Sequence, residues 1–135
     1  SSYDEHIKFV SLEVNAGSVE KAEAKLKIEI NDKVENTKIN GNGPVDATFN
    51  AIKKLTKTEF KLKLYQVNAI TAGTDAQGEV TVRLEDENLS SQAKGSDPDI
   101  IVASAKAYIN ALNRLIFKKT KSIKENSASL KIEGV

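Results

Sequence analysis

The stretch Gly41-Asn42-Gly43-Pro44-Val45-Asp46-Ala47 joins a strand-rich segment to a predicted helix. Gly41 and Gly43 tolerate backbone angles that other residues avoid, and they let another group approach the main chain closely. Pro44 suits the first helical position, because its φ is already near the helical value and it has no N–H to satisfy. Apolar residues then recur at spacings of four and three, as on one packed face of a helix: Val45, Phe49, Ile52 and Leu55. We therefore predict a helix from Pro44 to about Leu55.

This joint has the features of an anion site, because a helix start bordered by glycines offers free main-chain N–H groups. On that argument a phosphate and a carboxylate fit equally well. The alternative is a strand-to-helix turn that binds no ligand. A dinucleotide site is disfavoured, because Asp46 stands where the third glycine of G-x-G-x-x-G would be and no Walker sequence is present.

The segment before the joint alternates between apolar and polar residues, which predicts strands over residues 7–14 and 22–30. A turn at residues 15–18 separates them, and Asn31-Asp32 predicts a tight turn into a third strand through Val34 and Ile39. The expected inward faces are Val10, Leu12 and Val14 in the first strand and Ala22, Ala24, Leu26, Ile28 and Ile30 in the second.

The same pattern then repeats. Strands are predicted over residues 62–70, through Val80, Val82 and Leu84, and over residues 89–94, with turns at residues 71–74 and 87–88. Gly95-Ser96-Asp97-Pro98 resembles the Gly41 to Pro44 entrance, so we expect Asp97 as N-cap and Pro98 as the first helical residue. The second helix has apolar positions at spacings of four, three, four and three: Ile101, Ala105, Tyr108, Leu112 and Leu115.

The chain thus reads as one α+β domain over residues 1–135, made of two pseudo-symmetric βββα units at about residues 7–56 and 62–117. Packed together, the two units share a core that neither buries well alone. A polar tail follows over residues 118–135, with a short terminal strand expected over residues 130–132. The predicted two-fold relation places Asp46 and Asp99 near one cavity between the units. The plain alternative is that each carboxylate only favours its own helix start.

Composition excludes several classes of function. Twenty basic and nineteen acidic residues leave a net charge of +1, and aromatic residues are scarce, which argues against a nucleic-acid partner. There is no cysteine, and no apolar run approaches membrane-spanning length. His6 is the sole histidine, so a catalytic triad or a histidine metal cluster would rest on it alone. We therefore expect neither a catalyst nor a cofactor. Because the chain opens Ser1-Ser2-Tyr3 without methionine, we expect it to be a piece of a longer protein.

Four segments together resemble the C-terminal regulatory domain of 2-isopropylmalate synthase. They are Gly41 to Ala47, Leu64-Tyr65-Gln66-Val67, Gly78-Glu79-Val80-Thr81-Val82-Arg83, and the long run from Asp99 to Arg114 (DIIVASAKAYINALNR). The similarity spans roughly residues 7–116 in the same order. The related regulatory domain of citramalate synthase shares the architecture, and the Gly-Pro-Val-Asp-Ala form at residues 43–47 favours the isopropylmalate type.

The resemblance implies a cytoplasmic, homodimeric allosteric domain that binds leucine and inhibits its parent acyltransferase. That parent condenses acetyl-CoA with 2-oxoisovalerate on a metal-dependent barrel. Because these residues contain no barrel, we expect the fragment itself to be catalytically silent. The alternatives are an isoleucine-sensing domain of citramalate synthase, a dimerisation module without ligand, and a small enzyme that uses Asp46 and Asp99.

A zwitterionic amino acid needs N–H donors for its carboxylate, acceptors for its ammonium group and a small apolar wall. The helix starts after Gly43 and Asp97 are candidate donors, and Asp46, Asp99 or a carbonyl are candidate acceptors. The complete candidate set is Gly41, Asn42, Gly43, Pro44, Val45, Asp46, Ala47, Tyr65, Ala76, Asp97, Asp99 and Ile100.

Overall fold

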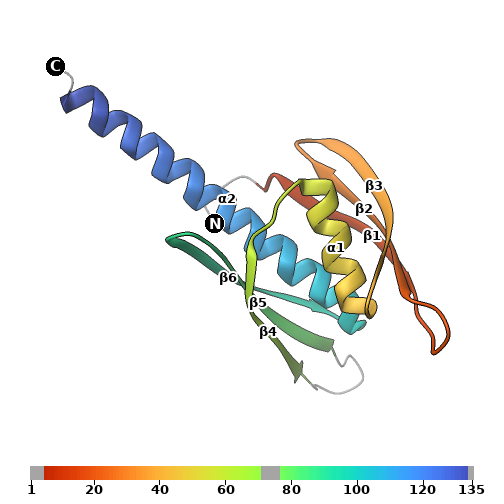
Figure 1. Ribbon diagram of the computed structural model, residues 1–135. Helices are drawn as coiled ribbons and strands as arrows, with labels where there is room; N and C mark the ends of the chain where they lie inside the picture. The colour runs from red at the N-terminus through yellow and green to blue at the C-terminus, as the bar shows by residue number, and fades with distance from the viewer. Residues whose placement is uncertain (1–4, 71–76, 134–135) are drawn as a thin grey trace.

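The computed structural model describes residues 5–70 and 77–133 (Figure 1). Eight elements follow one another along the chain. They are β1 (Ile7–Asn15), β2 (Ala22–Ile30), β3 (Lys33–Gly41), α1 (Pro44–Thr56), β4 (Lys61–Ile70), β5 (Gln77–Asp86), β6 (Leu89–Asp97) and α2 (Ile100–Glu133). The predicted order of two βββα units is therefore confirmed, and the first helix begins at Pro44 as expected.

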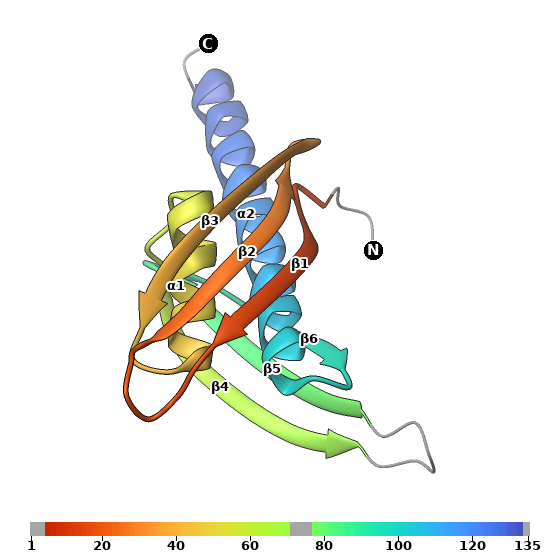
Figure 2. The same cartoon turned by 90° about the vertical axis from the view of Figure 1, so that its right-hand side faces the viewer.

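The strands form two separate antiparallel sheets, ordered β1-β2-β3 and β4-β5-β6. The two helices lie between the sheets: α1 packs on β2 and β3, and α2 packs on β5 and β6. The helices also pack on each other, and both begin at the same end of the domain (Figures 1 and 2). Both strand-to-helix joints lie at this end. Gly41 pairs with Ala22, which places the β1–β2 connection beside the first joint, and Asp97 of the second joint pairs with Gly78 at the start of β5.

Strand β2 follows the predicted alternation, with its even-numbered residues facing the helices and Leu26 and Ile28 fully buried. Its hairpin to β3 turns through Asn31 and Asp32, whose φ angles are 50° and 68°. Two positive φ angles match the right-handed twist of paired strands, and asparagine and aspartate tolerate them better than most residues. The predicted tight turn is confirmed.

The expected inward face of β1 is partly wrong. Val10 is 45% exposed, because the pairing register with β2 shifts between Phe9 and Ser11. Such a β-bulge adds one residue to a strand and reverses the alternation after it. Leu12 and Val14 therefore pack against the core as predicted, but Phe9 takes the place expected of Val10. A bulge at the equivalent place in β4, between Leu62 and Leu64, supports the internal repeat.

The predicted start of the second helix is also wrong. Strand β6 runs on through Asp97, and α2 begins at Ile100 rather than at Pro98. The N-cap is Asp99, whose Oδ1 accepts hydrogen bonds from the main-chain N–H groups of Ile101 (2.7 Å) and Val102 (3.2 Å). The Gly41 to Pro44 joint therefore corresponds to Asp97 to Ile100, two residues later than the sequence pattern suggested.

The predicted terminal strand over residues 130–132 is wrong, because α2 continues as one helix of 34 residues to Glu133. Its second half extends beyond both sheets (Figures 1 and 2). By length and composition alone, Ile100–Ala128 could cross a membrane, although no run of that length was predicted from the sequence. Because 56% of its most apolar window is buried inside the domain, α2 is the core helix here.

Candidate functional site

The first joint is a close contact between β3 and the helix that follows it. Gly41 is buried, and a Cβ added there would collide with the main-chain nitrogen of Ala47. The group that approaches this glycine is therefore the main chain of α1 itself. Gly43 differs: its φ of −176° is extended backbone that any residue adopts, and an added Cβ would have no neighbour within 4 Å. The joint is closed at Gly41 and open at Gly43.

Asp46 folds back over this joint. Its Oδ2 accepts a hydrogen bond from the main-chain N–H of Asn42 at 2.7 Å and lies 3.5 Å from Nδ2 of Asn50. Asp46 is the third residue of α1, the position from which a side chain reaches back to the residues before the helix in a capping box. The same carboxylate is negative near the positive end of the helix dipole, which is favourable.

The two helix starts are capped differently, although they occupy equivalent places in the repeat. At α2 the Asp99 carboxylate covers the first main-chain N–H groups. At α1 the N-cap is Gly43, which makes no side-chain capping hydrogen bond. Pro44 has no N–H, so Val45 and Asp46 carry the first main-chain donors of this helix. Asp99 thus shows how a carboxylate sits on one helix start, while the equivalent start at Gly43 is open.

Asp97 braces the second joint rather than capping the helix. Its Oδ2 accepts from the main-chain N–H of Asp99 at 2.9 Å, and its Oδ1 pairs with Nζ of Lys106 at 3.0 Å. The Asp99 N–H, and then the Lys106 ammonium group, hold the pKa of Asp97 below its usual value despite partial desolvation. Gly78 lies opposite Asp97 and leaves room for the Ile100 side chain, whose Cδ1 would collide with a Cβ there.

Tyr65 connects β4 to both helices. Its hydroxyl group is 2.7 Å from Oγ of Ser104 in α2, and its ring meets Phe49 of α1 edge-on with centroids 5.8 Å apart. Phe49 also contacts Tyr108, with centroids 4.6 Å apart. Phe49 and Tyr108 thus bring rings of the two helices into contact, and Phe49 lies one turn beyond Val45 along α1. The ring of Tyr65 therefore contacts α1 one turn beyond Val45.

Ten of the twelve candidate residues fall into two groups at the same end of the fold, and Tyr65 of β4 contacts Phe49 of α1. Gly41 to Ala47 form the first joint, and Asp97, Asp99 and Ile100 form the second. Ala76 lies outside the described residues. Asp46 and Asp99 each serve their own helix start, as the plain alternative expected, and this engagement gives no support to an enzyme that uses the pair.

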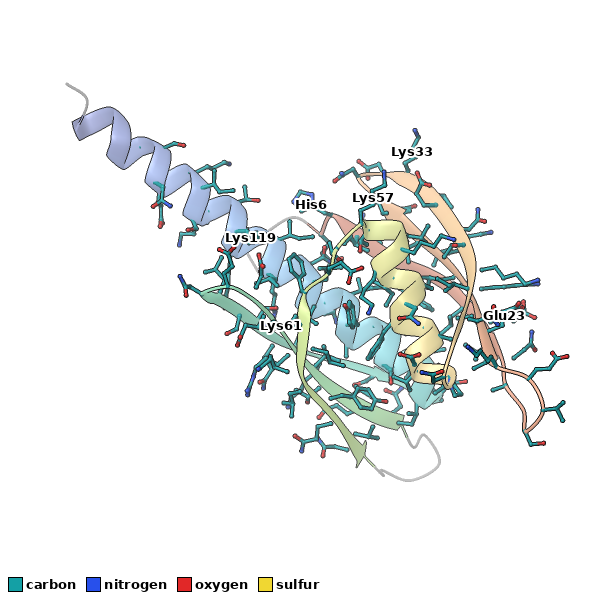
Figure 3. All side chains as sticks on the ribbon, viewed as in Figure 1. His6, Glu23, Lys33, Lys57, Lys61 and Lys119 are labelled. Carbon is teal, nitrogen blue, oxygen red and sulfur yellow. The ribbon has the colours of Figure 1, made fainter. Side chains whose placement is uncertain are left out.

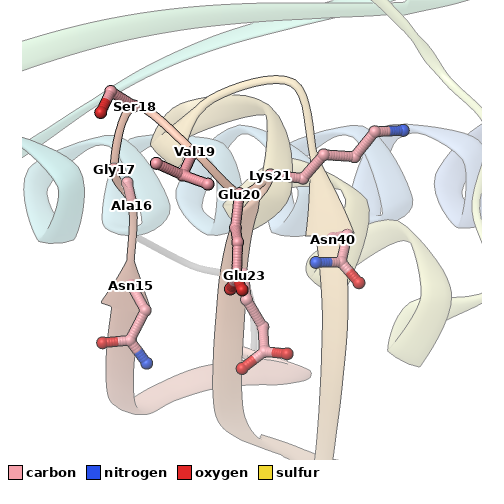
Figure 4. A pocket seen from close by; sticks show the side chains of 9 residues that line it. All are labelled: Asn15, Ala16, Gly17, Ser18, Val19, Glu20, Lys21, Glu23 and Asn40. Carbon is pink, nitrogen blue, oxygen red and sulfur yellow. The ribbon is translucent and has the colours of Figure 1, made fainter.

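Sequence reasoning missed a hollow of about 540 Å³ beside the first joint (Figure 4). It is lined by Asn15, Ala16, Gly17, Ser18, Val19, Glu20, Lys21, Glu23 and Asn40. Asn40 directly precedes Gly41, and its carbonyl accepts a hydrogen bond of 3.3 Å from Asn50 of α1. The available signal was the turn at residues 15–18, which pairing of β1 with β2 places next to the end of β3.

His6 lies far from these joints. It sits with Lys57 at the end of the domain where α1 finishes, and both residues line one hollow (Figure 3). Its Nδ1 is 3.1 Å from Oδ1 of Asn31. Within residues 5–70 and 77–133, no group of three or more His, Cys, Asp or Glu side chains could hold a metal ion.

Tyr108 provides a pH test of the shared core. Burial, with a smaller effect of the Glu59 charge, raises its pKa from 10.0 to about 12. The folded state therefore keeps the phenol proton that the unfolded state loses above pH 10. We expect the free energy of unfolding to be unaffected below pH 10 and to fall by about 2–3 kcal/mol as the pH rises to 12. Urea unfolding of the wild-type and Tyr108→Phe proteins across this range isolates the effect. An equal pH dependence in both proteins would contradict it.

The comparison with known families completes this picture. The family model of the LeuA allosteric (dimerisation) domain matches residues 1–116, which is most of the chain. The chain belongs to this family. The match covers both sheets and α2 as far as Ile116, so the second half of that helix lies outside it.

Curated relatives of this LeuA-type domain include proteins named 2-isopropylmalate synthase. The one from Afipia carboxidovorans is 50% identical over 125 residues, covering 93% of this chain and 24% of the relative. Those from Rhodopseudomonas palustris strain TIE-1 and Bradyrhizobium diazoefficiens are 45% identical over 130 residues and 46% identical over 129 residues. Each alignment covers 96% of this chain and 25% of the relative. The chain therefore spans about a quarter of the length of these synthases.

Proposed function

We propose that this domain is the regulatory part of a cytoplasmic 2-isopropylmalate synthase and that it binds leucine as a feedback inhibitor. The family is named for allostery and dimerisation, and the relatives carry the name of the synthase. The parent protein would condense acetyl-CoA with 2-oxoisovalerate on a catalytic barrel, with which this domain communicates.

The observation that most strongly supports leucine binding is the uncapped start of α1 at Gly43. Two main-chain donors there, on Val45 and Asp46, are not covered by a side-chain cap, and the space around Gly43 is open. The equivalent donors of α2 hold the Asp99 carboxylate. The carboxylate of a free amino acid matches that chemistry, because charge-assisted hydrogen bonds to helix N–H groups are among the stronger ones.

The rest of a leucine molecule finds suitable groups nearby. Both hydrogen bonds that Asp46 accepts within the described chain go to Oδ2. The other carboxylate oxygen, Oδ1, is therefore a candidate acceptor for the ammonium group. Half-buried Val45 and Tyr65 offer apolar surface for the side chain. Ala47 is fully buried behind Gly41, so it forms the floor of this region rather than its wall.

Inhibition would follow from a shift in population. Leucine bound next to α1 favours one arrangement of the paired domains over another, and this preference is transmitted to the barrels. Couplings of this kind typically amount to about 1–3 kcal/mol.

Two alternatives from the same family remain as outcomes of the test. An isoleucine-sensing domain of the citramalate synthase type differs by the position of one methyl group, which is worth about 1–3 kcal/mol in an apolar pocket. A dimerisation module without ligand uses the joints only as turns. Calorimetric titration with leucine, isoleucine and valine separates the three, since they predict strongest binding by leucine, strongest binding by isoleucine, and no binding.

The substitution Gly43→Asp tests the placement of the carboxylate. We expect it to weaken leucine binding at least tenfold, because the new side chain would cap α1 as Asp99 caps α2 and occupy the same donors. The melting temperature should stay the same or rise slightly, since the site is open and an Asp N-cap is at least as good as Gly. The matched control is Gly17→Asp, which adds the same charge at another open position. Wild-type affinity in Gly43→Asp would refute this placement.

A further inference from the structure

The free edge of β6 is closed by side chains of α2. Asn110, Arg114 and Lys118 donate hydrogen bonds to the main-chain carbonyls of Lys94, Gln92 and Ser90, at 2.8, 2.6 and 2.5 Å. The spacing explains the match: four helical residues rise about 6 Å, and two strand residues advance about 6.6 Å. Because alternate carbonyls of an edge strand point away from the sheet, this row of donors occupies groups that another strand would need.

Two further edges are blunted in other ways. At the start of β1, the buried side chain of Asn113 accepts from the N–H of Ile7 at 3.0 Å and donates to its carbonyl at 2.8 Å. The bulge after Phe9 then interrupts this edge. Strand β3 carries charged residues along its edge, and charge on an edge strand opposes pairing with another chain. Its charged residues are Lys33, Glu35 and Lys38.

Strand β4 has a bulge of its own between Leu62 and Leu64, but beyond this bulge it lacks the other protections. Among the residues that the structure describes, no side chain is hydrogen-bonded to the main chain of β4. Residues 64–70 contain no charged side chain, and they follow the bulge without interruption. Leu62 and Val67 are 44% and 47% exposed although they are apolar. Figure 2 shows β4 along the outer margin of its sheet, with β5 on its one paired side.

We propose that two copies of this chain pair through their β4 edges. A two-fold axis between the copies makes the two β4 strands antiparallel. It joins the three-stranded β4-β5-β6 sheet of one copy to that of the other in one continuous sheet. Antiparallel pairing centred on residues 64–70 brings only uncharged side chains opposite each other and moves Lys61 and Lys63 to the ends. The proposal rests on membership of a family named for dimerisation, and it assigns the surface and the strand orientation.

The test introduces charge at the proposed pairing strand. Val67→Lys and Val67→Glu each place like charges across the two-fold axis, within reach of each other on neighbouring strands. We expect either variant to raise the dimer dissociation constant at least tenfold by sedimentation equilibrium. An equimolar mixture of the two should restore association, because opposite charges then meet. The matched control is Val34→Lys on the β3 edge, where the valine is 52% exposed, and it should associate like the wild-type chain.

The outcomes are distinct. Wild-type association in both Val67 variants, or its loss in Val34→Lys alone, would overturn the assignment to β4. Failure of the mixed sample to recover would overturn the two-fold pairing, provided that circular dichroism shows both variants folded. The proposal would also be overturned if the wild-type chain stayed monomeric at 100 times the protein concentration used in the leucine titration. Leucine binding to the wild-type chain, measured separately, reports on the proposed effector and is independent of these results.

Discussion

Replacing Tyr108 with alanine is expected to lower the free energy of unfolding by about 3–5 kcal/mol. Tyr108 is 1% exposed and lies between the helices, where its ring contacts Phe49. Residues of both repeats surround this position, so a cavity there should not collapse without moving one repeat against the other. For a domain whose total stability falls within the usual 5–15 kcal/mol, the loss is a large share.

The measurement is equilibrium unfolding in urea, supported by thermal melting. Val19→Ala is a suitable control, because Val19 is 93% exposed in the β1–β2 connection and should change stability by less than about 0.5 kcal/mol. A single cooperative transition at lower urea is expected for Tyr108→Ala. Two separate unfolding transitions would show that the repeats do not share one core. A loss below about 1 kcal/mol would show that this ring is not its centre.

Gly95→Ala is expected to cost about 3 kcal/mol, at the upper end of the range for overpacked sites. Gly95 lies inside β6 where that strand touches α2. A Cβ there would collide with the main-chain nitrogen of Ala107 and lie 2.6 Å from the carbonyl oxygen of Ala103. Both atoms belong to the helix backbone, so relief requires the whole element to move. A flexible side chain could turn away, but a helix cannot.

The control for Gly95→Ala is Gly17→Ala, because an added Cβ at Gly17 has no neighbour within 4 Å. That control should be neutral or slightly stabilising, since alanine restricts the unfolded chain more than glycine does. Urea unfolding of the two variants gives the comparison directly. Equal stability of both would mean that β6 and α2 are not held as closely as the structure shows.

Local rules predict the parts of this fold that depend on neighbouring residues alone. Alternation identifies the buried face of β2, and Asn31-Asp32 identifies the hairpin, because both features are fixed within a few residues. The bulge in β1 depends on the pairing with β2, so Val10 was assigned to the wrong face. Alternation cannot reveal a reversal that originates in another strand.

The start of α2 was misplaced for a related reason. Gly95 suggested a turn, but glycine is needed at this position because α2 approaches it closely. Only the tertiary structure reveals that contact. The same residue type thus has two explanations, and the sequence favoured the local one. The N-cap was expected at Asp97, whereas the structure has Asp99 in that role, two residues later.

The candidate site was predicted as a set of residues but not as an arrangement. The resemblance supplied both joints, and the structure adds that Asp99 covers one helix start while Gly43 leaves the other open. The row formed by Asn110, Arg114 and Lys118 was missed, because its acceptors are main-chain atoms with no sequence signature. Polar residues four apart on a core helix were the available signal.

The length of α2 has a mechanical consequence. No glycine or proline interrupts its 34 residues, so it is a stiff rod of about 51 Å that begins at the second joint and ends outside the sheets. A rod of that length converts a small rotation at one end into a large displacement at the other. A tilt of roughly 5° about its first turn would carry the far end about 4 Å sideways, a distance comparable with the width of a side chain.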